Sequence, residues 1–329
     1  MDNHQPEFDW KERRPDDRQL REPVPDRRQP PPSHPRNRSR RSGLHILPLA
    51  VSVLALIVAI TALFLALRKE PEPDPAPPAE EEPVTFRFGD MVLTPIEGIP
   101  LNTYNKDAFR SDEKGRTTYE QAGEYAKTGV DVSTHQKEID WQAVAADGID
   151  FAILRAGNRG YTEGGLFVDQ TFAQNLQGAL EAGLEVGVYF FSQATTPEEA
   201  EQEADFVLGI LDGQELAFPV AFDWEFIADD EARTNHMDGA MITRCAAAFC
   251  ERIKAAGYQP AIYFNRTQGY LHYDLRELKD YQLWLAEYDT APDFYYHFDL
   301  WQYSDAGRVN GIQGNVDLNL SLSTGEPGI

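Results

Sequence analysis

The chain has 329 residues, a length that suits one large barrel or two smaller domains. Its formal net charge is −24, and residues 68–329 hold 19 basic against 46 acidic side chains. So acidic a region is a poor candidate for binding nucleic acid or other anionic polymers through charge. Residues 1–43 differ, because they hold 11 basic and 8 acidic residues and are rich in proline and arginine. We expect this basic segment to be a disordered tail.

An apolar segment follows the tail. Residues 44–67 contain no Asp, Glu, Lys or Arg over 24 positions, whereas about 20 apolar residues span a bilayer core. The alternatives are a signal-peptide core, which is usually shorter and followed by a small-residue cleavage site, and a buried helix. Four arginines between positions 36 and 41 precede the segment. The positive-inside rule therefore predicts a single-pass anchor in the cell membrane, with the lipid bilayer as partner, residues 1–43 in the cytoplasm and the rest outside.

The next segments predict a spacer and a lead-in. Residues 68–84 are rich in proline and glutamate and predict a stiff acidic linker. Residues 85–127 form a lead-in of open role, in which alternating apolar positions around Gly89 and Asp90 predict a β-hairpin. Residues 322–329 are expected to be a C-terminal tail.

A regular pattern occupies residues 128–321. Helical stretches separate the earlier of its apolar strand candidates, and short loops join the later ones. Alternation of strands and helices predicts parallel pairing with right-handed crossovers. The expected fold is α/β, an irregular TIM-like (β/α) barrel with fewer helices in its C-terminal third, preceded by a single transmembrane helix. The predicted strands are 129–133, 150–157, 185–192, 218–225, 259–265, 282–288, 298–304 and 315–320.

Two acids interrupt the apolar fourth strand. Asp223 and Glu225 stand two apart in "VAFDWEF" and so share one face of the strand. They fall at its C-terminal end, where such barrels carry their active sites. Asp131 lies near the end of the first strand, and Asp317 lies in the last strand, which barrel closure brings beside the first. Four carboxyl groups are therefore expected at one pocket mouth.

Crowded carboxyl groups suit acid catalysis. Like charges at close range raise the pKa of at least one carboxyl group, which can then donate a proton. We assign Glu225, with its longer reach, as the acid and Asp223 as an orienting or assisting carboxylate that steadies positive charge on a sugar ring. Two alternatives remain open: acids at strand ends can cap helices or pair with arginine, and several carboxylates can bind a hard cation. No zinc-type spacing of Cys and His residues is present.

Aromatic side chains are expected around the same strand ends, where rings and hydroxyl groups suit sugar binding. For any single ring, however, a place in the barrel core is the favoured interpretation. Gln302 and Arg155 are further candidates for substrate contact. Cys245 and Cys250, five apart in a predicted helix, are interpreted as small core residues. The aromatic candidates are Tyr189, Phe190, Tyr263, Trp284, Trp301 and Tyr303.

Together these segments resemble glycoside hydrolase family 25, the muramidases or lysozymes of the Chalaropsis and phage-lysin type. The resemblance covers about residues 128–321 in family order. The matching pieces are "GVDVSTHQKEIDW" (129–141), "FAILRAG" (151–157), "VGVYFFS" (186–192), "EEAEQEADFVL" (198–208), "VAFDWE" (220–225), "IYFN" (262–265), "LWLAEY" (283–288), "LWQYS" (300–304) and "NVDLN" (315–319).

The resemblance implies hydrolysis of the β-1,4 bond between N-acetylmuramic acid and N-acetylglucosamine in peptidoglycan. Glu225 matches the family's general acid, Asp223 its assisting carboxylate, and Asp131 and Asp317 the other site acids. Participation of the substrate's acetamido group is also compatible with two such acids. The resemblance implies no metal ion or organic cofactor. The chain departs from some members by carrying Phe190 in place of histidine.

The predicted membrane span is a second departure, since many members are released lysins. A tethered enzyme suits remodelling of the cell's own wall. Two other functions stay open: a non-catalytic peptidoglycan-binding protein on the same barrel, and a glycosidase for another N-acetylated polymer such as chitin.

Overall fold

The computed structural model describes residues 63, 84–121, 124–229 and 231–322. The described residues divide into two compact units between residues 95 and 96, a smaller one before this point and a larger one after it. Apart from single residues, the predicted tail 1–43, apolar segment 44–67, linker 68–84 and C-terminal tail 322–329 lie outside the described residues. Within the described ranges, no helix combines the length and apolarity that a membrane span requires.

A β-hairpin makes up the described part of the smaller unit. Strand β1 (Phe86–Phe88) pairs antiparallel with β2 (Met91–Leu93), and Phe88 lies opposite Met91. Gly89 sits in the turn at a φ of 56°, a conformation that glycine adopts without strain. The hairpin predicted around Gly89 and Asp90 is therefore confirmed.

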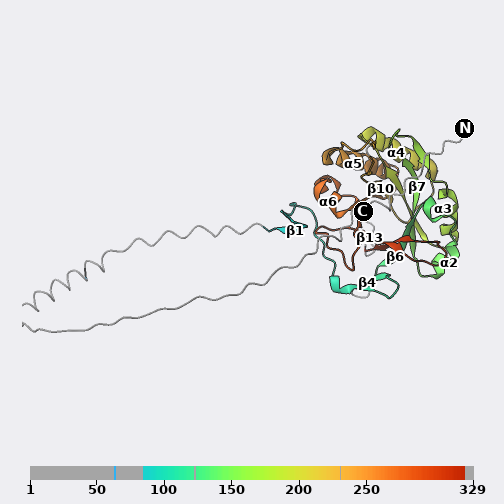
Figure 1. The fold of residues 1–329 in the computed structure, drawn as a ribbon, viewed down its shortest axis with the longest axis horizontal. Coiled ribbons are helices and arrows are strands. Elements are labelled where there is room, and N and C mark those ends of the chain that lie inside the picture. The colour runs from blue at the N-terminus through green and yellow to red at the C-terminus, as the bar shows by residue number, and fades with distance from the viewer. Residues whose placement is uncertain (1–62, 64–83, 122–123, 230, 323–329) are drawn as a thin grey trace, which may run out of the picture. The chain divides into compact units, whose positions relative to one another are not determined.

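In the described part of the larger unit, eight strands close into a barrel (Figure 1). Neighbouring strands are parallel from β6 round to β13, and β14 closes the ring antiparallel to both β13 and β6. A short strand, β8 (Leu166–Val168), adds to the end of β7. The eight are β6 (Lys127–Val132), β7 (Phe151–Arg159), β9 (Glu185–Ser192), β10 (Val220–Trp224), β11 (Pro260–Asn265), β12 (Gln282–Ala286), β13 (Leu300–Gly307) and β14 (Val316–Ser321).

All eight predicted strands are thus confirmed, and the antiparallel β14 is the main irregularity. Burial explains the apolar runs: every residue of β10 is buried, because the strand faces the barrel interior on one side and a helix layer on the other.

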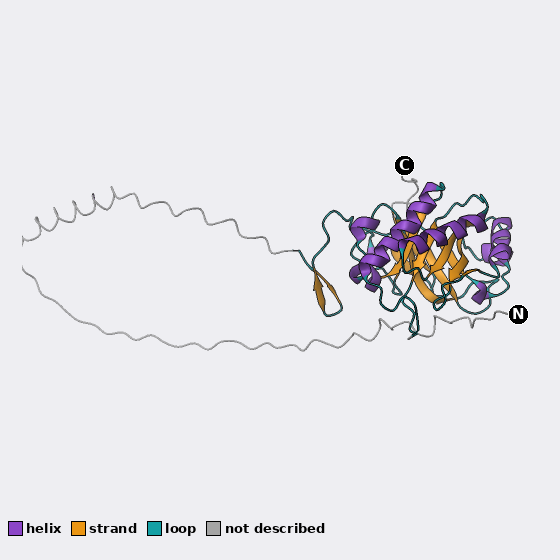
Figure 2. Ribbon diagram, turned by 90° about the horizontal axis from the view of Figure 1, so that it is seen from above, coloured by secondary structure: helices purple, strands orange, loops and turns teal. Residues whose placement is uncertain are grey.

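Helices pack outside the first part of this barrel, as Figures 1 and 2 show. Local sequence sets their starts: Thr196 caps the helix that begins with Pro197, and Asp238 caps the next one through the backbone N–H of Met241. The helices are α2 (Trp141–Ala146), α3 (Phe172–Glu181), α4 (Pro197–Leu211), α5 (Gly239–Ala255), α6 (Arg266–Leu271) and α7 (Leu275–Leu278), with 3-10 turns η3 (Lys106–Ala108) and η4 (Thr134–Gln136). Their decline toward the C-terminus confirms the prediction.

Part of the lead-in covers the barrel near β13, where the described connections carry no helix. Strands β3 (Phe109–Ser111), β4 (Thr117–Gln121) and β5 (Glu124–Tyr125) form a small antiparallel sheet. The ring of Phe109 lies 5.1 Å from that of Trp301, edge to face. Tyr104 donates its hydroxyl to the carbonyl oxygen of Phe298 at 2.6 Å. The lead-in therefore buries apolar surface that helices bury elsewhere.

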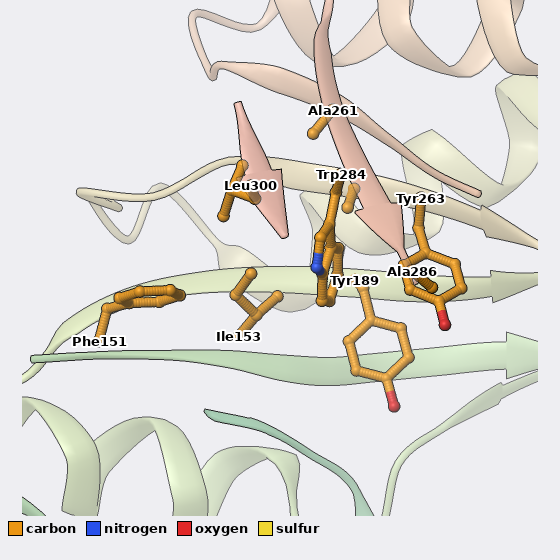
Figure 3. Close-up of a cluster of buried hydrophobic side chains, with 9 residues drawn as sticks. Phe151, Ile153, Tyr189, Ala261, Tyr263, Trp284, Ala286 and Leu300 are labelled. Atoms are coloured by element: carbon orange, nitrogen blue, oxygen red, sulfur yellow. The ribbon is translucent and has the colours of Figure 1, made fainter. Parts of the chain in front are cut away.

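Side chains fill the barrel interior (Figure 3). At the N-terminal end of the strands, the ring of Phe151 stacks on that of Phe218 with centroids 4.2 Å apart. Tyr189 and Tyr263 lie toward the C-terminal ends, where both hydroxyl groups point the same way along the barrel (Figure 3). The interior is therefore apolar at one end and polar at the other.

Candidate active site

All four predicted acids lie at the C-terminal edge of the parallel strands. Asp131 is near the end of β6, and Asp317, near the start of the antiparallel β14, is its register partner. Asp223 is in β10, and Glu225 is the first residue beyond that strand. Asp131, Asp223 and Asp317 are buried, whereas Glu225 is half-buried and accessible from outside. Alternation along the strand and closure of the barrel thus bring the acids to one edge.

Two neutral amides hold Asp131. Its Oδ2 accepts N–H groups from Gln302 at 2.7 Å and Asn319 at 2.9 Å. Both donors are buried: Gln302 lies on β13 and Asn319 lies on β14. Hydrogen bonds donated to a carboxylate favour its charged form. The two amides therefore fix the orientation of the Asp131 carboxyl group.

The amides are themselves fixed by predicted site residues. Gln302 Oε1 accepts the hydroxyl groups of Tyr263 at 2.9 Å and Tyr288 at 2.8 Å. Trp284 donates its indole N–H to Asn319 Oδ1 at 2.9 Å. Tyr263, Trp284 and Gln302 were predicted to contact substrate. The structure places all of them in the network behind Asp131, and substrate contact stays a prediction.

The hydroxyl group of Tyr189 lies within the electrostatic influence of carboxyl groups on different strands. Burial raises the pKa of its hydroxyl well above the usual value, and the nearby charges of Asp131, Asp223 and Asp169 raise it further, while Arg155 opposes them. Tyr189 therefore stays protonated and available as a hydrogen-bond donor. The charges of Asp131 on β6 and Asp223 on β10 both act on this one hydroxyl group.

Arg155 forms a buried ion pair. Its Nε lies 2.7 Å from Oδ2 of Asp169, which also accepts the backbone N–H of Thr134 at 3.0 Å. Oδ1 of Asp169 accepts both the N–H and the hydroxyl of Thr171. Asp169 was not predicted from the sequence, although an acid just before a helical stretch is a recognisable capping signal. Its role here is to fix Arg155 beside Tyr189.

Three predicted aromatic residues do not join the site. Phe190 lies on the outer face, 6.0 Å from the ring of Phe206 on α4. Trp301 faces the lead-in and donates its indole N–H to the carbonyl oxygen of Glu287, and its ring lies 5.4 Å from Tyr303. The prediction is wrong for these three because neighbours in a strand face opposite sides, and Tyr189, Leu300 and Gln302 take the inner side.

Asn319, which binds Asp131, is a residue that the sequence analysis missed although the sequence pattern could have identified it. It stands two positions after Asp317 on the same strand, so the two share a face. Tyr288, just past β12, had no comparable signal. Among the residues that the structure describes, no group of three or more His, Cys, Asp or Glu side chains is arranged to hold a metal ion.

Fold and site together define a β/α barrel with a carboxylate cluster at the C-terminal ends of its strands. The family model "Glycosyl hydrolases family 25" matches residues 130–312, more than half of the chain. This chain belongs to glycosyl hydrolases family 25, and the resemblance read from its sequence is confirmed.

Several known proteins are similar to it. The autolytic lysozyme of Clostridium acetobutylicum is 29% identical over 192 residues, which is 58% of this chain and 54% of that protein. The uncharacterized protein YegX of Escherichia coli K12 is 32% identical over 214 residues, 61% of this chain and 72% of that protein. This chain thus spans about half the length of the first relative and about seven tenths of the second.

A solved structure shares the fold. The modular autolysin LytC from Streptococcus pneumoniae superposes with a TM-score of 0.54 at 24% identity. The match covers 65% of this chain and 52% of that one.

Proposed function

We propose that this protein is a peptidoglycan hydrolase that cleaves the β-1,4 bond between N-acetylmuramic acid and N-acetylglucosamine. The observation that supports the proposal is the position of Asp131, Asp223, Glu225 and Asp317, each at or just beyond a strand at the C-terminal edge of the barrel. Family membership and similarity to a protein named autolytic lysozyme support the choice of substrate.

Glu225 is the proposed general acid. It follows directly on the buried end of β10, and its half-buried side chain can meet a glycosidic oxygen. Proton donation to that oxygen lets the bond break, and positive charge develops on the sugar ring. Asp131 and Asp223, both buried, are the proposed carboxylates that stabilise this charge or orient the acetamido group.

Tyr189 and Arg155 are proposed to contact the sugar from the inner side. The buried hydroxyl of Tyr189 stays protonated and can donate to a sugar oxygen, while Asp169 holds Arg155 in place. Tyr263, Trp284 and Gln302 are proposed to act close to the substrate through Asp131.

Membrane anchoring is part of the proposal. Residues 44–67 carry no charged side chain, and arginines crowd the preceding segment. An anchor there would keep the barrel outside the cell, tethered beside its own wall, where remodelling is the fitting task. Deletion of residues 44–67 should move the protein from the membrane fraction to the supernatant. Recovery of the full chain in the supernatant would contradict the anchor and leave the enzymatic proposal intact.

Digestion of purified peptidoglycan tests the activity. Mass analysis should show new reducing ends on N-acetylmuramic acid, and Glu225→Gln should lower the rate by about 1,000-fold. New ends on N-acetylglucosamine, or hydrolysis of chitin instead, would contradict the proposed bond. If wild type and Glu225→Gln are equally inert but both bind peptidoglycan, the barrel is a binding module.

A further inference from the structure

The backbone around Glu225 is held by side chains and not by neighbouring strands. The last residues of β10 in register are Asp223, opposite Tyr263 on β11, and Trp224, opposite Ser192 on β9. Beyond these pairs the sheet ladder gives no further support to the chain that carries Glu225. An acid must lie within about 3 Å of the oxygen it protonates, so its backbone needs another source of rigidity.

Two buried glutamines supply hydrogen bonds at this point. Gln193, just after β9, donates its amide N–H to the carbonyl oxygen of Glu225 at 3.0 Å. Gln268, on α6, donates its amide N–H to the carbonyl oxygen of Trp224 at 2.5 Å. The two glutamines follow the two strands that flank β10, so they hold its end from both sides.

Each glutamine is locked by its other hydrogen bonds. Gln193 is fully buried, donates also to the carbonyl oxygen of Ser192 at 2.8 Å, and accepts the hydroxyl of Thr234 at 2.9 Å. Gln268 is 2% exposed and forms a reciprocal capping box with Asn265, through bonds of 2.9 and 3.0 Å. These bonds keep each amide directed at the main-chain carbonyl oxygen that it binds, that of Glu225 for Gln193 and that of Trp224 for Gln268.

The segment after Glu225 is tied to the same place. Arg233 donates from its backbone to the carbonyl oxygen of Tyr161 at 2.8 Å and from its guanidinium to that of Gln193 at 3.1 Å, and it pairs with Glu199 at 2.6 Å. Gly164 permits this contact, because a Cβ atom there would come within 2.8 Å of the guanidinium. Arg233 thus contacts the main chain of Gln193, the residue that binds the carbonyl oxygen of Glu225.

We propose that Gln193 and Gln268 are positioning residues that set the location of Glu225 against the carboxylates of Asp131 and Asp223. They act through the main chain and touch no reacting atom. The inference rests on the proposed function, since it gives Glu225 the role of acid. Misplacement of a catalytic group by about 1 Å costs on the order of 100-fold in rate, so both glutamines bear on kcat.

The test is the steady-state kinetics of Gln193→Met and Gln268→Met on solubilised peptidoglycan. Methionine keeps the length of the side chain and removes the donor. We expect kcat to fall by about 10- to 100-fold in each variant, with KM within about threefold of wild type. Gln259→Met is the matched control, since that amide binds the carbonyl oxygen of Pro260 at the opposite end of β11, and it should leave kcat unchanged.

Thermal melting of each variant separates positioning from unfolding. If a methionine variant does not fold, Thr234→Val releases Gln193 without removing its amide and should still lower kcat severalfold. Unchanged kcat in both methionine variants, with active wild type and inert Glu225→Gln, overturns the inference and leaves the function standing. Loss that follows the unfolded fraction, or that falls on KM alone, also overturns it. Inert wild type overturns the proposed function itself.

Discussion

Buried carboxylates in this barrel are held in two different ways. Asp131, at the site, accepts hydrogen bonds from the neutral amides of Gln302 and Asn319. Glu203 and Glu287 are paired with the guanidinium groups of arginines at 2.7 and 3.0 Å. Arginine pairing compensates a buried negative charge, and amide donors fix the orientation of the carboxylate that they bind.

The pKa of Glu287 makes stability depend on pH. Burial raises the pKa of this carboxyl group from 4.5 to about 7, and Arg266 opposes the rise only in part. Between these values the folded protein holds more protons than the unfolded chain. The contribution of protonated Glu287 to the free energy of unfolding is therefore complete below about pH 4.5 and is lost as pH rises through about 7. Its size is roughly 3 kcal/mol at most, from about 1.4 kcal/mol per pH unit.

Denaturant unfolding of wild type and Glu287→Gln from pH 4.5 to 7.5 measures this contribution. The free energy of unfolding of wild type, relative to the variant, should decrease as pH rises, because glutamine does not titrate. Parallel curves for the two proteins would show that Glu287 has the same pKa in the folded and unfolded states.

The site acids could be predicted from the sequence, and the residues that support them could not. Period-two alternation and barrel closure were enough to bring Asp131 and Asp317 together with the acids of β10. The same logic extends to Asn319. Gln193 and Gln268 contact β10 from 32 and 44 residues away, through turns whose conformation depends on packing and not on local pattern.

At the level of the elements, β6 requires a glycine at position 129, because the ring of Phe151 fills the adjacent space at the N-terminal end of the barrel interior. A Cβ atom on Gly129 would lie 2.3 Å from the ring of Phe151, which cannot move because it is stacked on Phe218. Gly129→Ala should lower the free energy of unfolding by about 1–3 kcal/mol through overpacking. Gly209→Ala is the matched control: its added Cβ meets no atom within 4 Å on helix α4, so it should raise stability by about 0.5–1 kcal/mol.

Urea unfolding of the two alanine variants checks both signs at once. A stable Gly129→Ala protein would mean that β6 and β7 can separate at this point without loss of packing.

The lead-in acts as a replacement for missing helices. Short polar strands gave no sequence signal for this role, because their apolar residues are few and widely spaced. Phe109 is 6% exposed and packs on Trp301, whereas Tyr125, in the same small sheet, is 71% exposed. Phe109→Ala should therefore lower the free energy of unfolding by about 3–4 kcal/mol, and Tyr125→Ala by less than about 0.5 kcal/mol.

Chemical denaturation of the barrel, followed through tryptophan fluorescence, measures both variants. Equal stability of Phe109→Ala and wild type would show that the barrel is complete without the lead-in.

For the whole molecule, charge opposes the proposed encounter with substrate. Residues 68–329 carry 27 more acidic than basic side chains, and the carboxylates of peptidoglycan stem peptides are negative as well. Raising ionic strength from about 0.01 M to 0.15 M shortens the screening length from about 30 Å to about 8 Å. We expect KM on peptidoglycan to decrease over this range while kcat stays constant.

The matched substrate is a glycan fragment without stem peptides, whose KM should not respond to salt. A KM that increases with salt on intact peptidoglycan would mean that a local basic surface guides the polymer in spite of the overall charge.

The reversed direction of β14 has a consequence for attachment. Because that strand runs opposite to its neighbours, its last residue, Ser321, lies across from Lys127, the first residue of β6. The polypeptide thus comes into the barrel and leaves it on one rim, and the acids occupy the other. By this geometry, a module fused after β14 would start at the rim opposite the four acids and would leave their edge accessible to a large polymer.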